Sequence, residues 1–581
     1  MSGYRNVTEL ILDRAARSPG RDALVLLTED GGRAETAVRT VSYEELDRRA
    51  KALAGWLQEH GAAGERVLIL QSSRRLFAIS FLACLYAGAI AIPVPPASGR
   101  RHHEERVAGI VKDAAVRIAL TDSADAPEVS QLLARTGYGA VACLPADAVP
   151  EGAGWTPPEL GPDSIAFLQY TSGSTRDPRG VVVSHGNVLA NQEAISRALH
   201  TRPGARLGGW LPFHHDMGLV GQLLHPLWLG GTAVLLTPAA FVKKPVRWLE
   251  AVSRHGITVS SAPDFAYDLC VRRITDQQLA GLDLSGWETA VSGGEPVRAE
   301  TMRAFAERFA PAGLRPEALT PCYGLAESTL LVTAAADPAP PVHRTVDAAS
   351  LEHNRLREPV PGRPEREVVS CGTVAGGDLR IVDPESCETL PDGRIGEVWV
   401  RGGSVARGYW NRPRESADAF DCCTLEGERG YLRTGDLGTV EDGLLYVTGR
   451  LKDMIVVAGR NLYPQDLERT VQQVSALFGA GTAFAVPGER DRIVVVQELR
   501  ARSRYDVDLP ALTAAVGNRL AEEFEVQAGG VLLVRPGTVR RTTSGKVERA
   551  AMRGLFLRGE LKPLHQDLVP EVRQLMKAGV H

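Results

Sequence analysis

Residues 170–186 read Tyr-Thr-Ser-Gly-Ser-Thr-Arg-Asp-Pro-Arg-Gly-Val-Val-Val-Ser-His-Gly. A turn rich in serine, threonine and glycine stands there between an apolar strand, Ile165 to Leu168, and a second apolar run, Val181 to Val183. Such a turn offers small hydroxyls and unhindered backbone N–H groups to a polyphosphate. It matches neither the Walker A pattern nor the strand-then-GxGxxG pattern of dinucleotide-binding proteins. The alternative is an ordinary surface turn, since connectors of this composition are common.

Five further motifs follow in a fixed order, and they decide between these two interpretations. They are Ser292-Gly-Gly-Glu-Pro296, Tyr323-Gly-Leu-Ala-Glu-Ser328, Tyr431-Leu-Arg-Thr-Gly-Asp436, Gly449-Arg-Leu-Lys-Asp453 and Thr543-Ser-Gly-Lys546. In this order the set resembles the adenylate-forming superfamily of acyl-CoA synthetases, peptide-synthetase adenylation domains and luciferases. The resemblance extends from about Val41 to about Arg553 and implies an enzyme that joins a carboxylate to AMP and releases pyrophosphate.

Composition is that of an ordinary globular protein. The 581 residues exceed a single core and predict two or more domains. A formal net charge of −4 lacks the excess of basic residues that is typical of nucleic-acid-binding proteins. The eight cysteines show no metal-binding spacing and no secreted disulfide framework, and the first residues resemble no signal peptide. We therefore expect reduced thiols and a cytoplasmic protein.

The chain alternates strand and helix patterns, which predicts an α/β fold with parallel βαβ units. Ser42 and Glu45 have capping-box spacing and precede a helical apolar face, and Arg66 to Gln71 has the composition of a buried strand. The segment Phe77 to Ile92 is apolar but shorter than the roughly 20 residues that cross a bilayer. It predicts a buried helix that leads into a core strand, and no membrane span.

A domain boundary is predicted near Gly449, where a β-rich stretch from Leu444 to Thr448 ends. The resemblance implies a large N-terminal domain of βα subdomains plus a β-rich subdomain, residues 1–449. It also implies a hinge at 450–453 with Lys452 as the hinge residue, and a small mobile α+β C-terminal domain, residues 454–581.

The cofactors implied are ATP and Mg²⁺. The phosphates are expected to meet Thr171, Ser172, Gly173, Ser174 and Thr175, with Arg179 adding a charge-assisted bond. The nucleotide is expected at Gly293, Gly294, Glu295, Tyr323, Gly324, Leu325 and Ala326, where Tyr323 would stack on adenine. Asp436 resembles the ribose-diol acceptor and Arg450 its partner, while Glu327, with Thr171, is the expected Mg²⁺ site.

Lys546 is the principal catalytic candidate. The lysine of the family's last motif enters the active site only when the C-terminal domain closes, and its charge can bridge the substrate carboxylate and the α-phosphate. His215 and Arg179 complete the catalytic set that the resemblance implies. A surface loop lysine beside Arg540 and Arg541 is the alternative for Lys546.

Within the superfamily, local features resemble the fatty acyl-AMP ligases, which pass the acyl group to an acyl carrier protein. These features are Trp210 to Leu219 with its His-Asp-Met-Gly motif, Phe265 to Cys270, Val369 to Gly372 and Gly459 to Glu468. Between Glu327 and Gly372 lie 44 residues, an excess that resembles the ligase insertion at about 338–367. The implied acyl pocket contains Phe213, Met217, Gly218 and Phe265.

Three departures from the ligase pattern put chain length and acceptor in question, namely Ser261, Ser292 and Leu462. Two alternatives stay open. The nearer is an acyl-CoA synthetase that uses free CoA, and the farther is a non-catalytic nucleotide-binding protein on the same fold. The partners expected are a fatty acid and a carrier protein, with no nucleic acid.

Overall fold

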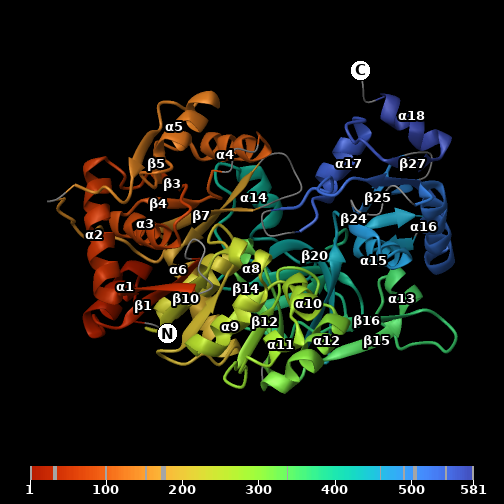
Figure 1. Cartoon of the computed structure of the whole chain (residues 1–581), viewed down its shortest axis with the longest axis horizontal. Helices are drawn as coiled ribbons and strands as arrows, with labels where there is room; N and C mark the ends of the chain where they lie inside the picture. The colour runs from red at the N-terminus through yellow and green to blue at the C-terminus, as the bar shows by residue number, and fades with distance from the viewer. Residues whose placement is uncertain are drawn as a thin grey trace.

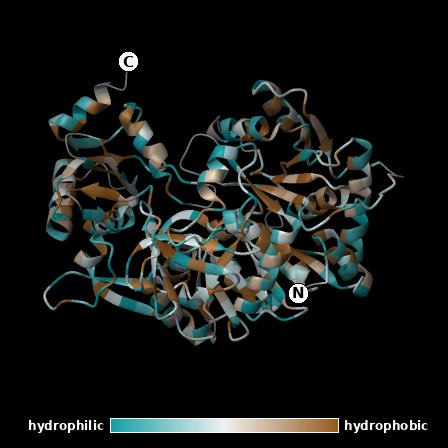
Figure 2. Cartoon of the chain, turned by 180° about the vertical axis from the view of Figure 1, so that it is seen from behind, coloured by the Kyte–Doolittle hydropathy of each residue, from teal (hydrophilic) through white to brown (hydrophobic). Residues whose placement is uncertain are grey.

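The computed structural model describes residues 3–29, 36–97, 101–150, 153–171, 178–335, 338–457, 460–487, 491–500, 507–542 and 546–578. A large N-terminal part and a smaller C-terminal part lie side by side, the latter blue in Figure 1. In Figure 2 the hydrophobic residues gather on the inner strands and the hydrophilic ones on the outer helices. The α/β architecture and the division into a large and a small domain, both expected from the sequence, are confirmed. The domain boundary after residue 449 and the hinge at 450–453 remain predictions.

The first N-terminal sheet has six strands in the order β6-β5-β3-β4-β7-β8. Its strands are β3 (Arg66–Ile69), β4 (Ile90–Pro93), β5 (Ile118–Thr121), β6 (Ala142–Pro145), β7 (Ile165–Thr171) and β8 (Arg179–Ser184). Strands β3 to β7 pair in parallel, as predicted, and β8 returns antiparallel to β7. The two apolar runs of the opening stretch are therefore neighbouring antiparallel strands at the edge of the sheet, and residues 172–177 between them lie outside the described residues.

The second N-terminal sheet has nine strands in the order β17-β14-β13-β12-β11-β9-β10-β1-β2. Its strands are β1 (Asp22–Glu29), β2 (Thr36–Ser42), β9 (Arg206–Gly209), β10 (Thr232–Leu236), β11 (Val259–Ala262), β12 (Thr289–Ser292), β13 (Leu319–Gly324), β14 (Leu331–Ala334) and β17 (Thr373–Val374). From β1 to β13 the pairing is parallel, and the strands at both edges are antiparallel. The motifs at 292–296 and 323–328 thus follow neighbouring parallel strands, and so they meet at one edge of the sheet.

Helices cover these sheets and fill the space between them. They are α1 (Val7–Arg17), α2 (Tyr43–Glu59), α3 (Arg74–Ala87), α4 (Arg101–Ala114), α5 (Ala126–Arg135), α6 (His185–Ala198), α7 (His225–Trp228), α8 (Pro238–Lys243), α9 (Val246–His255), α10 (Asp264–Arg273), α11 (Asp276–Leu279), α12 (Ala299–Phe309) and α14 (Pro413–Ala419), with the π-helix η1 (Met217–Leu224) and the 3-10 turns η2 (Ala310–Ala312), η3 (Pro316–Ala318) and η4 (Ala326–Ser328). Helix α2 begins after Ser42, whose side chain accepts a bond from the Glu45 N–H, so the predicted start is correct.

Helix α3 is the segment that could be mistaken for a membrane span. Every residue from Leu76 to Ala87 is buried, and the helix ends at Gly88, whose φ of 70° is a left-handed cap that leads into β4. The predicted buried helix followed by a core strand is therefore confirmed. Among the described residues, no helix is both long and apolar enough to cross a membrane.

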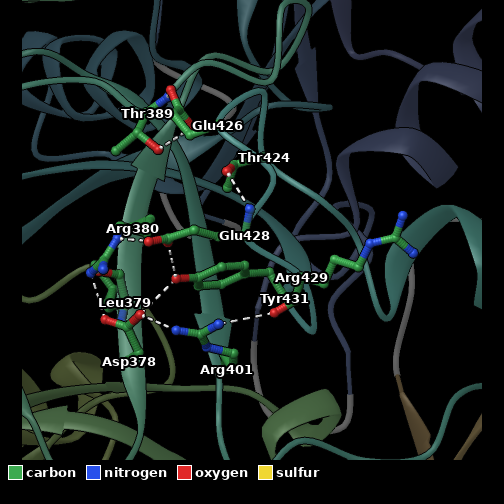
Figure 3. Close-up of polar contacts among 10 residues, drawn as sticks. All are labelled: Asp378, Leu379, Arg380, Thr389, Arg401, Thr424, Glu426, Glu428, Arg429 and Tyr431. Carbon is green, nitrogen blue, oxygen red and sulfur yellow. Dashed lines mark hydrogen bonds and ion pairs between the residues drawn. The ribbon is translucent and has the colours of Figure 1, made fainter.

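The β-rich subdomain is an antiparallel sheet of β18 (Asp378–Val382), β19 (Gly396–Arg401), β20 (Leu432–Glu441) and β21 (Leu444–Arg450). A polar network beside it is drawn in Figure 3. Asp378 accepts bonds from Arg380 at 2.6 Å, Arg401 at 2.9 Å and the Tyr431 hydroxyl at 2.6 Å. Arg401 also donates to the carbonyl of Arg429. These bonds fix the start of β20, the strand that carries Asp436.

The C-terminal part has its own sheet and its own core. The sheet is β24 (Phe478–Val486), β25 (Arg492–Leu499), β26 (Ala528–Val534) and β27 (His565–Leu568), and a ribbon of β22 (Ile455–Val457) and β23 (Arg460–Leu462) precedes it. Its helices are α15 (Pro464–Val474), α16 (Leu509–Phe524), α17 (Arg549–Leu557) and α18 (Pro570–Ala578). Separate apolar clusters pack on the two faces of this sheet, as expected for an independent folding unit.

The segment at about 338–367 forms a hairpin with a short helix. It consists of β15 (His343–Asp347), α13 (Ala348–Glu352) and β16 (Glu365–Val369). In Figure 1 this green hairpin extends beneath the blue C-terminal part. The long connection predicted from the sequence is therefore ordered and lies against the C-terminal part.

Candidate active site

A cavity of about 2210 Å³ opens between the N-terminal and C-terminal parts. Sixteen residues predicted from the sequence line it: Arg179, His215, Met217, Phe265, Gly293, Gly294, Glu295, Tyr323, Gly324, Leu325, Ala326, Glu327, Asp436, Arg450, Lys452 and Lys546. Phe213 packs against Phe77 in the core, and neither Phe213 nor Gly218 is among the described residues of the cavity wall. Ser172, Gly173, Ser174 and Thr175 lie outside the described residues, as does the side chain of Thr171.

Asp436 lines the cavity together with other residues that the motifs predict to bind the nucleotide. It lies opposite Arg450 in the β20–β21 ladder, and the Arg450 Nε donates to its Oδ1 at 2.7 Å. The hydroxyl of Tyr323 donates to Oδ2 at 2.8 Å. The carboxylate of Asp436 in turn raises the pKa of Arg450. Two donors thus orient the carboxylate of Asp436, and a carboxylate can accept hydrogen bonds from a diol.

Tyr323 and Gly324 lie where β13 ends. The predicted role of Tyr323, stacking on adenine, needs only the face of its ring, because its hydroxyl is bound to Asp436. A Cβ atom on Gly324 would lie 1.9 Å from the carbonyl oxygen of Leu330. The close approach that requires glycine here is therefore made by the protein's own backbone.

Glu327 belongs to a polar group that the motifs alone did not reveal. The Tyr409 hydroxyl donates to its Oε1 at 3.0 Å, and the Arg179 guanidinium lies 5.5 Å from the centre of the Tyr409 ring. Arg179 also forms a 2.8 Å ion pair with Glu415. Burial raises the pKa of Glu327. The sequence analysis missed Tyr409, and the only signal for it is its aromatic neighbourhood at Tyr409-Trp410.

Lys546 lines the cavity, although the motif that carries it belongs to the C-terminal part. Its N–H donates to the Thr542 hydroxyl at 3.1 Å, and its carbonyl accepts from the Thr542 N–H at 2.7 Å. Burial lowers the pKa of Lys546, and the charge of Arg450 lowers it further. Carboxylates act in the opposite direction, those of Asp216, Glu295 and Asp436. Lys546 therefore lies within electrostatic reach of Arg450 and Asp436, two residues that the motifs predict to bind the nucleotide, and its catalytic role stays a prediction.

His215 and Asp216 belong to the His-Asp-Met-Gly segment. Burial, with the nearby charges of Lys546 and Arg106, lowers the pKa of His215 to about 3. Burial also raises the pKa of Asp216, whereas Lys546 opposes that shift. His215 is consequently neutral at physiological pH, so it can exchange hydrogen bonds with a substrate but adds no charge. Asp216 was not singled out from the sequence.

Two groups of mainly apolar residues contribute to the cavity wall. The first consists of Ile195, Leu199, Leu207, Gly221, His225, Val259, Ser261, Val291, Cys322, Leu330 and Leu331. The second consists of Trp210, Leu211, Pro238, Val242, Pro263, Phe265 and Leu269. Ser261 accepts a bond from Gln222, so this departure from the ligase pattern adds a polar pair to the wall. Leu462, by contrast, is buried in the C-terminal core.

The hairpin at 338–367 binds both parts of the protein. Arg460 of β23 makes two bonds to Glu352, Nε to Oε2 at 2.6 Å and Nη2 to Oε1 at 2.9 Å. Asn461 donates to Asn354 at 3.0 Å. Arg366 of the hairpin also forms an ion pair with Asp466 of α15. On the other side, Arg303 and Glu367 are joined by two bonds of 2.7 Å. The hairpin therefore connects α12 to the C-terminal part.

The profile of the AMP-binding enzyme family matches residues 11–410, so the chain belongs to this family. Among its relatives, the medium-chain-fatty-acid–[acyl-carrier-protein] ligase JamA of Moorena producens is 38% identical, with 91% of each chain covered. The 4-hydroxyphenylalkanoate adenylyltransferase of Mycobacterium tuberculosis is 36% identical, with coverage of 96% of this chain and 93% of the relative.

Solved structures agree with these relatives. A fatty acid AMP ligase from Legionella pneumophila superposes with a TM-score of 0.75 at 34% identity, covering 97% of this chain and 98% of the other. A fatty acyl-adenylate ligase from a study of the E. coli and L. pneumophila enzymes superposes with a TM-score of 0.85 at 32% identity, covering 96% and 98%. The resemblance to the adenylate-forming superfamily found in the motifs is confirmed.

Proposed function

We propose that this protein activates a fatty or related apolar carboxylic acid as an acyl-AMP, with release of pyrophosphate, and passes the acyl group to the phosphopantetheine thiol of an acyl carrier protein. The observation that carries the proposal is the shared cavity. Its wall combines the polar groups of Lys546, the Asp436–Arg450 pair and Glu327 with two groups of apolar residues. A nucleotide and a long apolar acid can therefore meet in one cavity.

In the first half-reaction an oxygen of the substrate carboxylate attacks the α-phosphorus of ATP, and the bond to the bridging oxygen breaks so that pyrophosphate leaves. Asp436 would accept hydrogen bonds from the ribose hydroxyls and so fix the position of the α-phosphate. Lys546 would contact both the carboxylate and the α-phosphate, where negative charge accumulates in the transition state. Arg179 would contact the outgoing phosphates, as its fork of donors suits phosphate geometry.

The residues present suit Mg²⁺ as the accompanying metal. Glu327 is a half-buried carboxylate of the cavity wall, and Mg²⁺ in such sites typically combines one or two carboxylates with phosphate oxygens. The described residues contain no cluster of three His, Cys, Asp or Glu side chains able to hold a metal by themselves. Mg²⁺ would thus be held by Glu327 together with ATP, and it would neutralise phosphate charge.

For the second half-reaction we propose that residues 450–453 form a hinge and that the hairpin at 338–367 disfavours the arrangement that uses free CoA. The Glu352–Arg460 and Arg366–Asp466 pairs support this proposal, because both join the hairpin to the C-terminal part while Lys546 lines the cavity. The carrier-protein ligases among the relatives support it as well. An acyl-CoA synthetase remains the alternative.

Pyrophosphate release measured over a panel of fatty, aryl and amino acids tests the first half-reaction. Mass analysis of the products with either CoA or a phosphopantetheinylated carrier protein tests the second. We expect fatty acids to exceed amino acids, and carrier protein to exceed CoA. Equal turnover of CoA and of a cognate carrier protein would favour the acyl-CoA synthetase.

A further inference from the structure

The first apolar group of the cavity wall lies where the nine-stranded sheet packs against the π-helix η1. On the sheet side, Leu207 of β9 pairs with Val259 of β11, and Val291 of β12 follows on the same wall. Gly221 and His225 line the opposite wall. Helix η1 begins at Met217, whose sulfur would lie 3.5 Å from a Cβ on Gly294, and His225 follows directly after the helix ends. His225 is therefore separated by the length of η1 from the residues predicted to bind the nucleotide, and it also lines the cavity.

His225 is fixed by contacts at both ring nitrogens and by stacking on Trp228. Its Nδ1 lies 2.5 Å from Gln192 Oε1 and its Nε2 lies 2.9 Å from Thr201 Oγ1. Gln192 donates its amide to the carbonyl of Val220, which sets its oxygen toward the histidine. The Trp228 ring stacks on the imidazole at 5.7 Å between centroids with an interplanar angle of 12°. The ring therefore cannot swing aside without the loss of two buried hydrogen bonds.

The protonation state of His225 follows from these contacts. Burial lowers its pKa to about 3, so the ring is neutral. Nδ1–H then donates to Gln192 and Nε2 accepts from the Thr201 hydroxyl. A neutral imidazole has one donor and one acceptor, and both are in use. Only carbon atoms of the ring remain to meet a ligand, which suits an alkyl end and not a hydroxylated one.

Gly221 lies one helical turn before His225 on the same wall. The bond from the His225 N–H to the Val220 carbonyl is the wide i+5 bond of a π-helix, a feature frequent at functional sites. A Cβ on Gly221 would meet only Leu330 Cδ2, at an ordinary contact distance of 3.4 Å. A side chain at this position would therefore fit the helix and project into the cavity.

We infer that His225 is the floor of the acyl tunnel and sets the greatest chain length that the enzyme accepts, with an unsubstituted alkyl end preferred. This inference rests on the proposed function. Below the limit, each added methylene should raise kcat/KM about fourfold, because it is buried on binding. Beyond the limit the chain meets a ring that cannot move, and kcat/KM should fall.

The test compares chain-length profiles of kcat/KM, from pyrophosphate release and acyl-AMP mass, for the wild type and two opposite variants. His225→Ala should move the limit to acids longer by roughly two to four methylenes, because the imidazole ring is removed. Gly221→Leu should move it to shorter acids. His255→Ala is the matched control. The hydrogen bond from Arg206 is accepted by the backbone carbonyl of His255, which the substitution retains, so this variant should keep the wild-type profile.

The outcomes separate this inference from the proposed function. A wild type that forms no acyl-AMP from any fatty acid contradicts the proposed function. A wild type that does so, with the same length limit in His225→Ala and Gly221→Leu, overturns the inference alone. If His225→Ala does not fold, Gly221→Leu decides. The chain-end preference has its own readout, because an acid with a terminal hydroxyl should lose about 5- to 150-fold in kcat/KM relative to its alkyl counterpart.

Discussion

Replacing Arg460 by glutamine should raise the share of acyl-CoA among the products. Arg460 joins the C-terminal part to the 338–367 hairpin through two short bonds to Glu352. Its side chain is 24% exposed and that of Glu352 is 14% exposed, so water screens the pair only in part. Glutamine keeps most of the length of the side chain and removes the charge. The change therefore weakens the connection without altering the cavity.

The size of the effect follows from these contacts. Charge-assisted bonds between groups of this burial contribute about 1–2 kcal/mol, less than a fully buried pair and more than an exposed one. A bias of that size changes the ratio of two domain arrangements by about 5- to 30-fold. The assay is the ratio of acyl-CoA to acyl-carrier protein, determined by mass spectrometry with both acceptors present.

Arg492→Gln is the matched control, because Arg492 also forms an ion pair, with Glu571, but entirely within the C-terminal part. It should leave the product ratio unchanged. The reasoning is refuted if Arg460→Gln folds, forms acyl-AMP normally and still gives the wild-type ratio. It is equally refuted if Arg492→Gln changes the ratio as much.

Three further outcomes are expected. Lys546→Ala should slow acyl-AMP formation by about 10²- to 10³-fold with little loss of ATP binding, and a wild-type rate in single-turnover assays would contradict the role of this lysine. Tyr409→Phe removes the hydrogen bond to Glu327, so the Mg²⁺ concentration needed for half-maximal activity should change, and an unchanged Mg²⁺ titration would exclude such a link. Burial lowers the pKa of His185 in the folded protein to about 4, below its usual 6.5. The stability that comes from burying the neutral ring is therefore fully present above pH 6.5 and is lost as the pH falls toward 4. The free energy of unfolding, measured with urea, should therefore fall between pH 7 and pH 5 by about 2 kcal/mol less in His185→Gln than in the wild type. An equal fall in both proteins would contradict this assignment.

Much of the fold could be predicted from short-range patterns. The strand at Arg66, the helix after Ser42 and the buried helix before Gly88 each depend on periodicity or capping within one segment. The strand order of the nine-stranded sheet could not be predicted in this way, because the pairing of β9 with β10 and β11 depends on packing between distant segments. The same limit applies to the site.

The order of the motifs predicted Lys546, Asp436 and Glu327 as site residues, but it did not predict which side chains contact them. Tyr409 reaches Glu327 across 82 positions, and no local pattern connects the two. Phe213 is apolar and aromatic, as expected of an acyl-pocket residue, yet its side chain packs in the core against Phe77. Successive side chains of an irregular segment do not alternate between two faces, so the sequence did not show on which side Phe213 lies.

If the C-terminal part rotates about the proposed hinge at 450–453, the β20–β21 ladder separates a fixed half of the site from a moving half. Asp436 and Arg450 are the last pair of this ladder, and Arg450 is the first residue of the proposed hinge. A rotation that begins after Arg450 would therefore leave the proposed ribose contacts in place. Lys546 lies on the far side of that point and would withdraw. The intermediate would then stay bound while the group that assists both its formation and its pyrophosphorolysis is gone. The reaction would then favour the forward direction. Pyrophosphate that returned to the site would meet the acyl-AMP without the lysine that assists the reverse reaction to ATP.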